Sequence, residues 1–350
     1  MHMTDALLSP AVGGGFWAAA IAAISYSARH LRKQIDDKLI PLMGVLGAFV
    51  FAAQMINFAI PGTGSSGHIG GGMLLAILLG PSASFIVVAS ILTVQGLFFA
   101  DGGLLALGCN IWNLGVYPCF IAYPLVFRPV AGIAPSAKRI AVASVLSVVA
   151  ALQLGAFSVV LQTRLSGISD LPFNSFLLLM QPIHLAIGVV EGIVTAGVVN
   201  YVRALQPEAV DASSSARQRL SYKKVLLAAA LLAVITGGVL SWFASTRPDG
   251  LQWSIERITG AGELAGRANE VTRRAGEIQE TTSLFPGYRF PGQSEAVAKE
   301  TAEQWPTVNA GTSLAGLIGG STVFGFVMML GFGIRAYRKM RERRQGLENS

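Results

Sequence analysis

Histidine has the clearest chemical potential in this sequence, because only four histidines are present and two of them lie in unusual settings. His68 lies within residues 61–72, PGTGSSGHIGGG, which separate two strongly apolar segments, and His2 directly follows Met1. Glycine lets a backbone bend tightly and approach another group closely. The glycine-rich stretch therefore predicts a shaped site rather than a spacer.

A free N-terminus followed by histidine offers three nitrogen donors in one plane. The α-amine of Met1 and the backbone nitrogen of His2 close a five-membered chelate ring. The same backbone nitrogen and Nδ1 of His2 close a six-membered ring, and His68 would complete a square. Deprotonating a backbone amide requires a strongly polarising ion that accepts planar nitrogen ligands, so Ni(II) or Cu(II) fits, Co(II) is possible, and Zn(II) or Mg(II) fits poorly.

The predicted metal ligands are therefore Met1, His2 and His68. The start of the chain, MHMTDALLSP, lacks the basic region of a signal peptide, so we expect Met1 to be retained. The alternative is that His2 belongs to a disordered terminus and that His68 is an ordinary loop histidine.

The composition is that of an all-α polytopic membrane protein, since 52% of the 350 residues are hydrophobic and only 13% are charged. The net charge of +7 then reflects loop asymmetry across a membrane, with some contact to anionic lipid, rather than binding to nucleic acid. The expected spans are residues 11–28, 39–57, 69–81, 82–100, 103–127, 138–163, 175–202, 224–245 and 313–337. The third is short and ends near Pro81, where a helix breaks easily.

Basic residues cluster in four places, near residues 29–38, 128–139, 203–224 and 335–344. Seven spans before residue 204 and two after it place all four clusters on the inside. The N-terminus then lies outside, as do residues 57–68, 101–103 and 246–312, and the C-terminus lies inside. Met1, His2 and His68 thus share the outer face, which the metal prediction requires.

Several segments resemble the cobalt/nickel substrate-binding components (CbiM/NikM type) of energy-coupling-factor ABC transporters. The similar segments are MHMTDALLSP at the start, QMINFAIPGTGSSGHIGGGMLLAILLGP at 54–81, DGGLLALGCNIWNLG at 101–115 and HLAIGVVEGIVT at 184–195. PDGLQWS at 248–254 and FPGYRFPG at 285–292 resemble the small CbiN/NikN or PDGLE-type partner. Met3, Thr4, Ala6 and Gln252 depart from the family pattern, although none of these changes removes a predicted donor.

The resemblance implies a fused protein with three parts: a metal-binding membrane domain of about seven helices at 1–204, a cytoplasmic linker at 205–222, and a two-span PDGLE-like domain with an outer segment at 223–350. It also implies that Ni(II) or Co(II) is the transported substrate and that Met1, His2 and His68 hold it. The partners implied are ATPase subunits and a coupling transmembrane subunit in a bacterial or archaeal cytoplasmic membrane. The sequence itself has no G-x-x-x-x-G-K-[ST] loop, so ATP hydrolysis is expected on separate subunits and the chain is not expected to be an enzyme.

Other polar residues admit two interpretations each. Ser66, Gln95, Asn110 and Asn113 are candidates to orient the metal ligands, or they form ordinary hydrogen bonds between helices. His184 and Glu191, seven residues apart on one expected helix, are either functional or hydrogen-bonded interior residues, and we favour the latter.

Two other functions remain alternatives. An intramembrane serine protease would use Ser66 with His184 as its base, and a passive divalent-metal channel would conduct without partners. We expect Asp101 to be a turn residue with the two glycines that follow it. Residues 255–282 could form an amphipathic helix in the outer segment. The sequence does not decide between nickel and cobalt, although planar nitrogen ligation favours nickel slightly.

Overall fold

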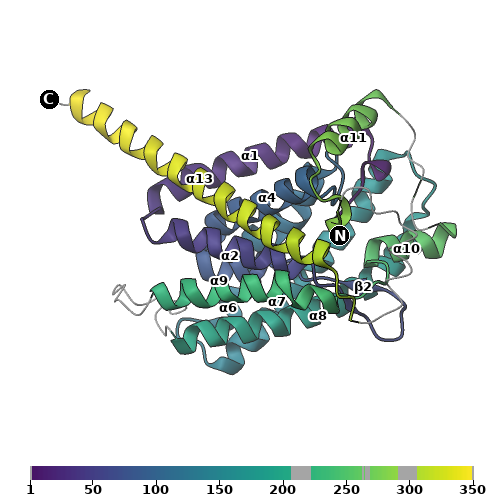
Figure 1. The fold of residues 1–350 in the computed structure, drawn as a ribbon, viewed down its shortest axis with the longest axis horizontal. Helices are drawn as coiled ribbons and strands as arrows, with labels where there is room; N and C mark the ends of the chain where they lie inside the picture. The colour runs from purple at the N-terminus through teal and green to yellow at the C-terminus, as the bar shows by residue number, and fades with distance from the viewer. Residues whose placement is uncertain (1, 206–221, 262–263, 265–268, 291–305, 349–350) are drawn as a thin grey trace.

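The computed structural model describes residues 2–205, 222–261, 264, 269–290 and 306–348, and it is a bundle of membrane-length helices with helices and loops gathered at one end (Figure 1). Within these residues, six helices are long and apolar enough to cross a membrane. The all-α, polytopic architecture predicted from composition is therefore confirmed. The six are Pro10–Gln34, Pro81–Phe98, Leu107–Ala131, Ala137–Ser166, Phe173–Ala204 and Ala310–Gln345.

The first part of the chain contains most of the bundle. After a short 3₁₀ turn, η1 (Asp5–Leu7), its elements are α1 (Pro10–Gln34), α2 (Leu39–Gln54), the two-residue strands β1 (Phe58–Ala59) and β2 (Ser66–Gly67), α3 (Gly72–Leu79), α4 (Pro81–Phe98), α5 (Leu107–Ile111), η2 (Trp112–Phe127), α6 (Arg128–Ala131), α7 (Ala137–Ser166) and α8 (Phe173–Leu205). The antiparallel pair β1 and β2 forms a hairpin between α2 and α3. This hairpin carries the glycine-rich stretch.

The predicted span at 69–81 is short, as expected: α3 has eight residues. It ends at Gly80, whose φ of 83° belongs to a backbone conformation that favours glycine. Pro81 then starts α4 at the first helical position, where proline loses no helical hydrogen bond. A helix of this length does not span a bilayer alone, so α3 enters the bundle from the hairpin and turns back into α4.

The side chains separate into a packed interior and an apolar exterior. Phe51, Phe85 and Phe176 are completely or almost completely buried among the helices. In contrast, Leu178 and Leu125 are 72% and 69% exposed on spanning helices. Leucine on the outer face of a spanning helix is what a hydrocarbon surrounding requires, so these faces are the lipid-contacting surface.

The second part of the chain adds two helices to this bundle and a polar segment at one end of it (Figure 1). Glycines bring α9 (Tyr222–Gly238) and α13 (Ala310–Glu348) together: a Cβ on Gly316 of α13 would lie 2.5 Å from the carbonyl oxygen of Gly237 of α9. Such close backbone approach is typical of membrane helix packing. The elements of the second part of the chain are α9 (Tyr222–Gly238), η4 (Leu240–Phe243), α10 (Gly250–Thr259), α11 (Glu270–Thr282), η5 (Pro286–Tyr288) and α13 (Ala310–Glu348).

The outer segment contains two helices where the sequence suggested one over residues 255–282. α10 starts at the N-cap Asp249, whose Oδ1 accepts a hydrogen bond from the N–H of Gln252 at 2.8 Å. It ends at Gly260 with a φ of 73°, a left-handed cap that stops the helix. Asn269 caps α11 with a reciprocal hydrogen-bonded box. The predicted linker at 205–222 lies almost wholly outside the described residues.

Candidate metal site

The two histidines singled out in the sequence lie together in space. The rings of His2 and His68 are stacked, with centroids 5.1 Å apart and planes at 12°. They come from opposite ends of the first 70 residues, one from the N-terminal segment and one from the residues after β2. The two rings are therefore close together in space, and this proximity is a condition of the metal prediction. Met1, the third predicted ligand residue, lies outside the described residues.

The N-terminal segment is fixed at its third residue by the loop and helix around residues 101–111. The N–H of Met3 donates to Oδ1 of Asn110 at 2.8 Å, and the carbonyl oxygen of Met3 accepts from Gly103 and from Nδ2 of Asn110. Asp5 accepts the N–H of Ala106 at 2.9 Å. Asn110 therefore holds the backbone next to His2 rather than the imidazole itself.

The His2 imidazole contacts a carboxylate that we had assigned only to a turn. Nδ1 of His2 lies 3.2 Å from Oδ1 of Asp101, and Nε2 of His2 is buried without a hydrogen-bond partner among the described residues. The six-membered chelate proposed above uses Nδ1. Forming it requires the ring to exchange Asp101 for the ion.

Asp101 itself is held by the second part of the chain. The hydroxyl of Tyr288 donates to Oδ2 of Asp101 at 2.5 Å, and its ring stacks on Phe99 with centroids 5.1 Å apart. Burial raises the pKa of Asp101, but the nearby His2 and the hydrogen bonds from His2 and Tyr288 lower it by more. The net direction is downward, so Asp101 stays a charged acceptor at neutral pH. Tyr288 lies in FPGYRFPG at 285–292, but nothing in that pattern predicts its contact with Asp101.

The His68 ring has a defined hydrogen-bond donor. Nδ1 lies 3.0 Å from the carbonyl oxygen of Ile69, which only accepts, so Nδ1 carries the proton. Nε2 therefore keeps the lone pair that a metal ligand needs. Burial is the main cause that lowers the pKa of His68 to about 4. The ring is therefore neutral at physiological pH.

The remaining candidates occupy two different positions. Gln95 reaches the glycine-rich loop indirectly, because its Nε2 donates to Oε1 of Gln54 at 2.8 Å and Gln54 in turn donates to the carbonyl oxygen of Gly70 at 2.8 Å. Asn113 pairs with Gln162 at 2.8 Å, and its Nδ2 is 3.8 Å from the sulfur of Met3. Neither of these amides contacts a histidine ring directly.

Ser66 joins the glycine-rich loop to the outer segment of the second part. Its hydroxyl donates to the carbonyl oxygen of Arg247 at 2.7 Å, and its N–H donates to that of Pro248 at 2.8 Å. His184 donates Nδ1–H to the carbonyl oxygen of Met180 at 2.8 Å, within its own helix. The two residues of the protease interpretation are thus engaged elsewhere in the described structure, and the hydroxyl has no base.

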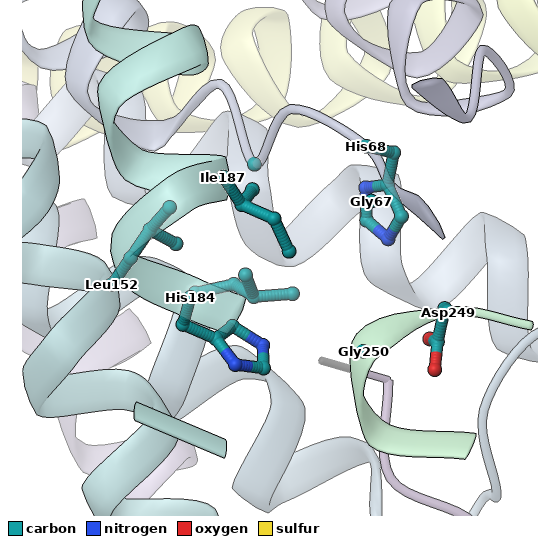
Figure 2. Close-up of a pocket in the computed structure, with 9 residues that line it drawn as sticks. Gly67, His68, Leu152, His184, Ile187, Asp249 and Gly250 are labelled. Carbon is teal, nitrogen blue, oxygen red and sulfur yellow. The ribbon is translucent and has the colours of Figure 1, made fainter. Parts of the chain in front are cut away.

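A small cavity of about 10 Å³, room for a single water molecule, adjoins His68 (Figure 2). His68 and Asp249 lie on one side of it and His184 on the other. Gly250 closes it, because a Cβ there would lie 2.6 Å from Ile183 and 3.3 Å from the ring of His184. His184 is therefore a wall residue of the space next to His68, and nothing in the sequence predicted this position.

The described residues contain no cluster of three or more histidine, cysteine, aspartate or glutamate side chains that could hold a metal ion. The predicted donor set does not need one, because two of its four nitrogens are the terminal amine and a backbone amide. What the described residues supply are the two imidazoles. The predicted donor set requires the amine of Met1 in addition to these two rings.

Two family models cover most of the chain. The model described as cobalt uptake substrate-specific transmembrane region (CbiM) matches residues 2–209, and the PDGLE domain model matches residues 223–336. A protein of Archaeoglobus fulgidus, whose name describes it as a fused nickel transport protein (NikMN), is 33% identical over 346 residues, covering 97% of this chain and 99% of the relative.

Other relatives match about three fifths of the chain. The fused nickel transport protein NikMN of Rhodobacter capsulatus is 30% identical over 220 residues, covering 59% of this chain and 63% of the relative. The cobalt transport protein CbiM of Sorangium cellulosum is 29% identical over 219 residues, which is 60% of this chain and 95% of that protein. A crystal structure of a transition metal transporter, 30% identical, covers 59% of this chain and 95% of its own, with a TM-score of 0.53.

Proposed function

From the premise that the chain belongs to the CbiM family of cobalt uptake transmembrane regions and carries a PDGLE domain, we propose that it captures Ni(II) or Co(II) as the substrate-binding component of an importer. It is a multi-pass membrane protein whose relatives are named as transport proteins. The observation that carries the capture proposal is the stacking of His2 on His68, 5.1 Å apart.

The proposed ligands are the α-amine of Met1, the backbone nitrogen and imidazole of His2, and Nε2 of His68. The hydrogen bond from Nδ1 of His68 to Ile69 supports its part, because ligating histidines usually donate their other nitrogen to a fixed acceptor. The described residues around this site offer nitrogen and no thiolate. The two cysteines, Cys109 and Cys119, are buried at other positions and form no disulfide. This set suits a divalent ion that prefers planar nitrogen ligands.

In the proposed transport cycle, the ion is captured on the outer face of a bacterial or archaeal cytoplasmic membrane, with the N-terminus outside and the C-terminus inside. Separate ATPase subunits and a coupling transmembrane subunit then drive its release to the inside. Residues 1–204 would be the metal-binding domain, 205–222 a cytoplasmic linker and 223–350 an auxiliary domain. Contacts of the outer segment with Ser66 and Asp101 support the auxiliary role.

Flux measurements in reconstituted vesicles test this function. With ATPase and coupling subunits present, the full chain should accumulate Ni(II) or Co(II) only when ATP is supplied, and His68→Ala should lose most of that uptake. Ser66→Ala tests the protease alternative, because a protease would lose its peptidase activity with this hydroxyl whereas a transporter has no peptidase activity to lose. Rapid flux without the partner subunits would instead identify a passive channel.

A further inference from the structure

Glu191 is a buried carboxylate that the sequence left without a role. It lies in the middle of α8 and is 3% exposed. Its Oε2 accepts the N–H of Gly70 at 2.7 Å and its Oε1 accepts the N–H of Gly71 at 2.8 Å. Among the described residues it has no ion-pair partner. An ionised or ionisable group in a spanning helix is costly and is usually retained for a function.

The two N–H groups that Glu191 accepts belong to the loop that carries His68. Gly71 is the N-cap of α3 with a φ of 72°, and a carboxylate is favourable at a helix N-terminus. The opposite side of the loop is also held, because Gln54 donates to the carbonyl oxygen of Gly70 at 2.8 Å. A Cβ at Gly71 would lie 2.4 Å from Val50, so the backbone has little room to move.

A single peptide group connects Glu191 to the imidazole. The N–H of Gly70 and the carbonyl of Ile69 belong to the same planar unit, and they point in opposite directions in a trans peptide. Glu191 binds the N–H end of this unit, and Nδ1 of His68 donates to its carbonyl oxygen at 3.0 Å. Fixing the peptide plane therefore fixes the acceptor that sets both the tautomer and the direction of the His68 ring.

We propose that Glu191 is a positioning residue for His68: it holds the Ile69–Gly70 peptide so that Nε2 of His68 is aimed at the metal ion. This inference rests on the proposed function, since it assigns His68 as a ligand. It goes beyond that function by giving α8 a direct part in the outer site. The bond to Gly71 fixes the start of α3 in the same way, so the two oxygens of one carboxylate hold the two successive N–H groups after Ile69.

The experiment is Ni(II) titration of the full chain in detergent, purified with a free N-terminus, comparing the unaltered protein with Glu191→Gln. Glutamine has the same size, but its NH2 group takes the place of one carboxylate oxygen. That NH2 group, which can only donate, would face a backbone N–H, which also only donates. We expect Ni(II) affinity to fall about 10- to 100-fold, the usual range for the loss of a group that orients a metal ligand. The visible absorption band of bound Ni(II) should shift as well. Gln153→Leu, which removes a hydrogen bond between α7 and α8 away from the loop, is the matched control and should leave both readouts unchanged.

A double substitution separates positioning from a general structural effect. In a His68→Ala background, Glu191→Gln should cause no further loss of affinity, because there is no ring left to position. An equal loss in both backgrounds, or unchanged affinity and spectrum in the single variant, would overturn the proposal. If His68→Ala itself leaves Ni(II) affinity unchanged, the proposed function fails instead, so the two failures are distinguishable.

Amide exchange in the unaltered protein provides a test that needs no substitution, in case Glu191→Gln does not fold. The amides of Gly70 and Gly71 should exchange much more slowly than those of the exposed Gly62 and Gly64 in the same loop. Equal exchange rates at these four glycines would show that the carboxylate does not hold the loop in solution, and the proposal would be wrong.

Discussion

The glycine-rich loop is held from two sides in two different ways. From the bundle, side chains reach its backbone: Glu191 accepts from Gly70 and Gly71, and Gln54 donates to Gly70. From the outer segment, backbone carbonyls of Arg247 and Pro248 accept from Ser66. On the inner side the bundle contributes polar side chains that stand out in an apolar sequence, whereas the outer segment contributes backbone carbonyls, which every residue possesses.

Around residues 96–102 the outer segment uses both kinds of contact. Backbone N–H groups of Leu284 and Phe285 donate to the carbonyl oxygen of Phe98, and that of Gly287 donates to Phe99. Side chains add contacts as well: Tyr288 donates to Asp101, Gln279 donates to the carbonyl oxygens of Gly96 and Gly102, and Thr282 donates to that of Leu97. The second part of the chain thus supports this region through both backbone and side-chain contacts, so losing one of its side chains should cost less than overpacking the inner side of the loop.

Two glycines of this loop compare the inner and outer ends directly, and the largest effect is expected here. Gly71 and Gly62 have φ values of 72° and 76°, so alanine at either costs about 1–2 kcal/mol in backbone strain. A Cβ at Gly71 would also lie 2.4 Å from Val50, whereas Gly62 has nothing within 4 Å. Overpacking adds about 1–3 kcal/mol, so Gly71→Ala should lower the thermal unfolding midpoint in detergent clearly more than Gly62→Ala. Equal shifts would show that the inner side is not tightly packed.

Tyr288→Phe removes one side-chain contact of the outer segment and keeps the ring stacked on Phe99. A hydrogen bond to a charged group contributes about 1.5–3 kcal/mol. We therefore expect an intermediate loss of stability and faster proteolysis within the outer segment, while the backbone contacts at Phe98 and Phe99 keep the segment in place. Tyr26→Phe, at an exposed position, is the control. A fully detached outer segment would mean that the backbone contacts are weaker than described.

The smallest effect concerns protons released on binding. The pKa of His68 is lowered to about 4, so its ring is already neutral at pH 6 and releases no proton to a metal. An imidazole of ordinary pKa, near 6.5, would release about 0.8 proton at that pH. Calorimetry in buffers of different ionisation enthalpy should give the same proton count for the unaltered protein and His68→Ala. A count about 0.8 higher in the unaltered protein would contradict the buried, neutral ring.

The sequence was sufficient for the architecture and for the pairing of His2 with His68. Apolar segments of bilayer length and the basic loops between them place helices without knowledge of side-chain contacts. It did not reveal that Asp101 contacts His2 or that Tyr288 contacts Asp101, because these contacts depend on how the outer segment folds onto the bundle. Glu191 stood out in the sequence as an ionisable residue within a span. Its partners could not be predicted, because they are backbone N–H groups, which almost every residue has.

The helix predicted over 255–282 shows the same limit. The amphipathic pattern was correct in kind, but Gly260, with its left-handed backbone, divides it into α10 and α11. A glycine within a helical pattern is either tolerated or acts as a C-cap. Gly260 is a C-cap here, and the sequence pattern alone did not decide between these two outcomes.

Ni(II) binding by two forms of the full chain tests the central claim most directly: one with a free Met1 amine, and one extended by a single residue before Met1. If the terminal amine, His2 and His68 share the ion, the native form should bind tightly with a diamagnetic, planar Ni(II) absorption spectrum. The extended form should lose both the high affinity and the spectrum. Equal affinity and equal spectra in the two forms would contradict the account, because the amine would then not be a ligand.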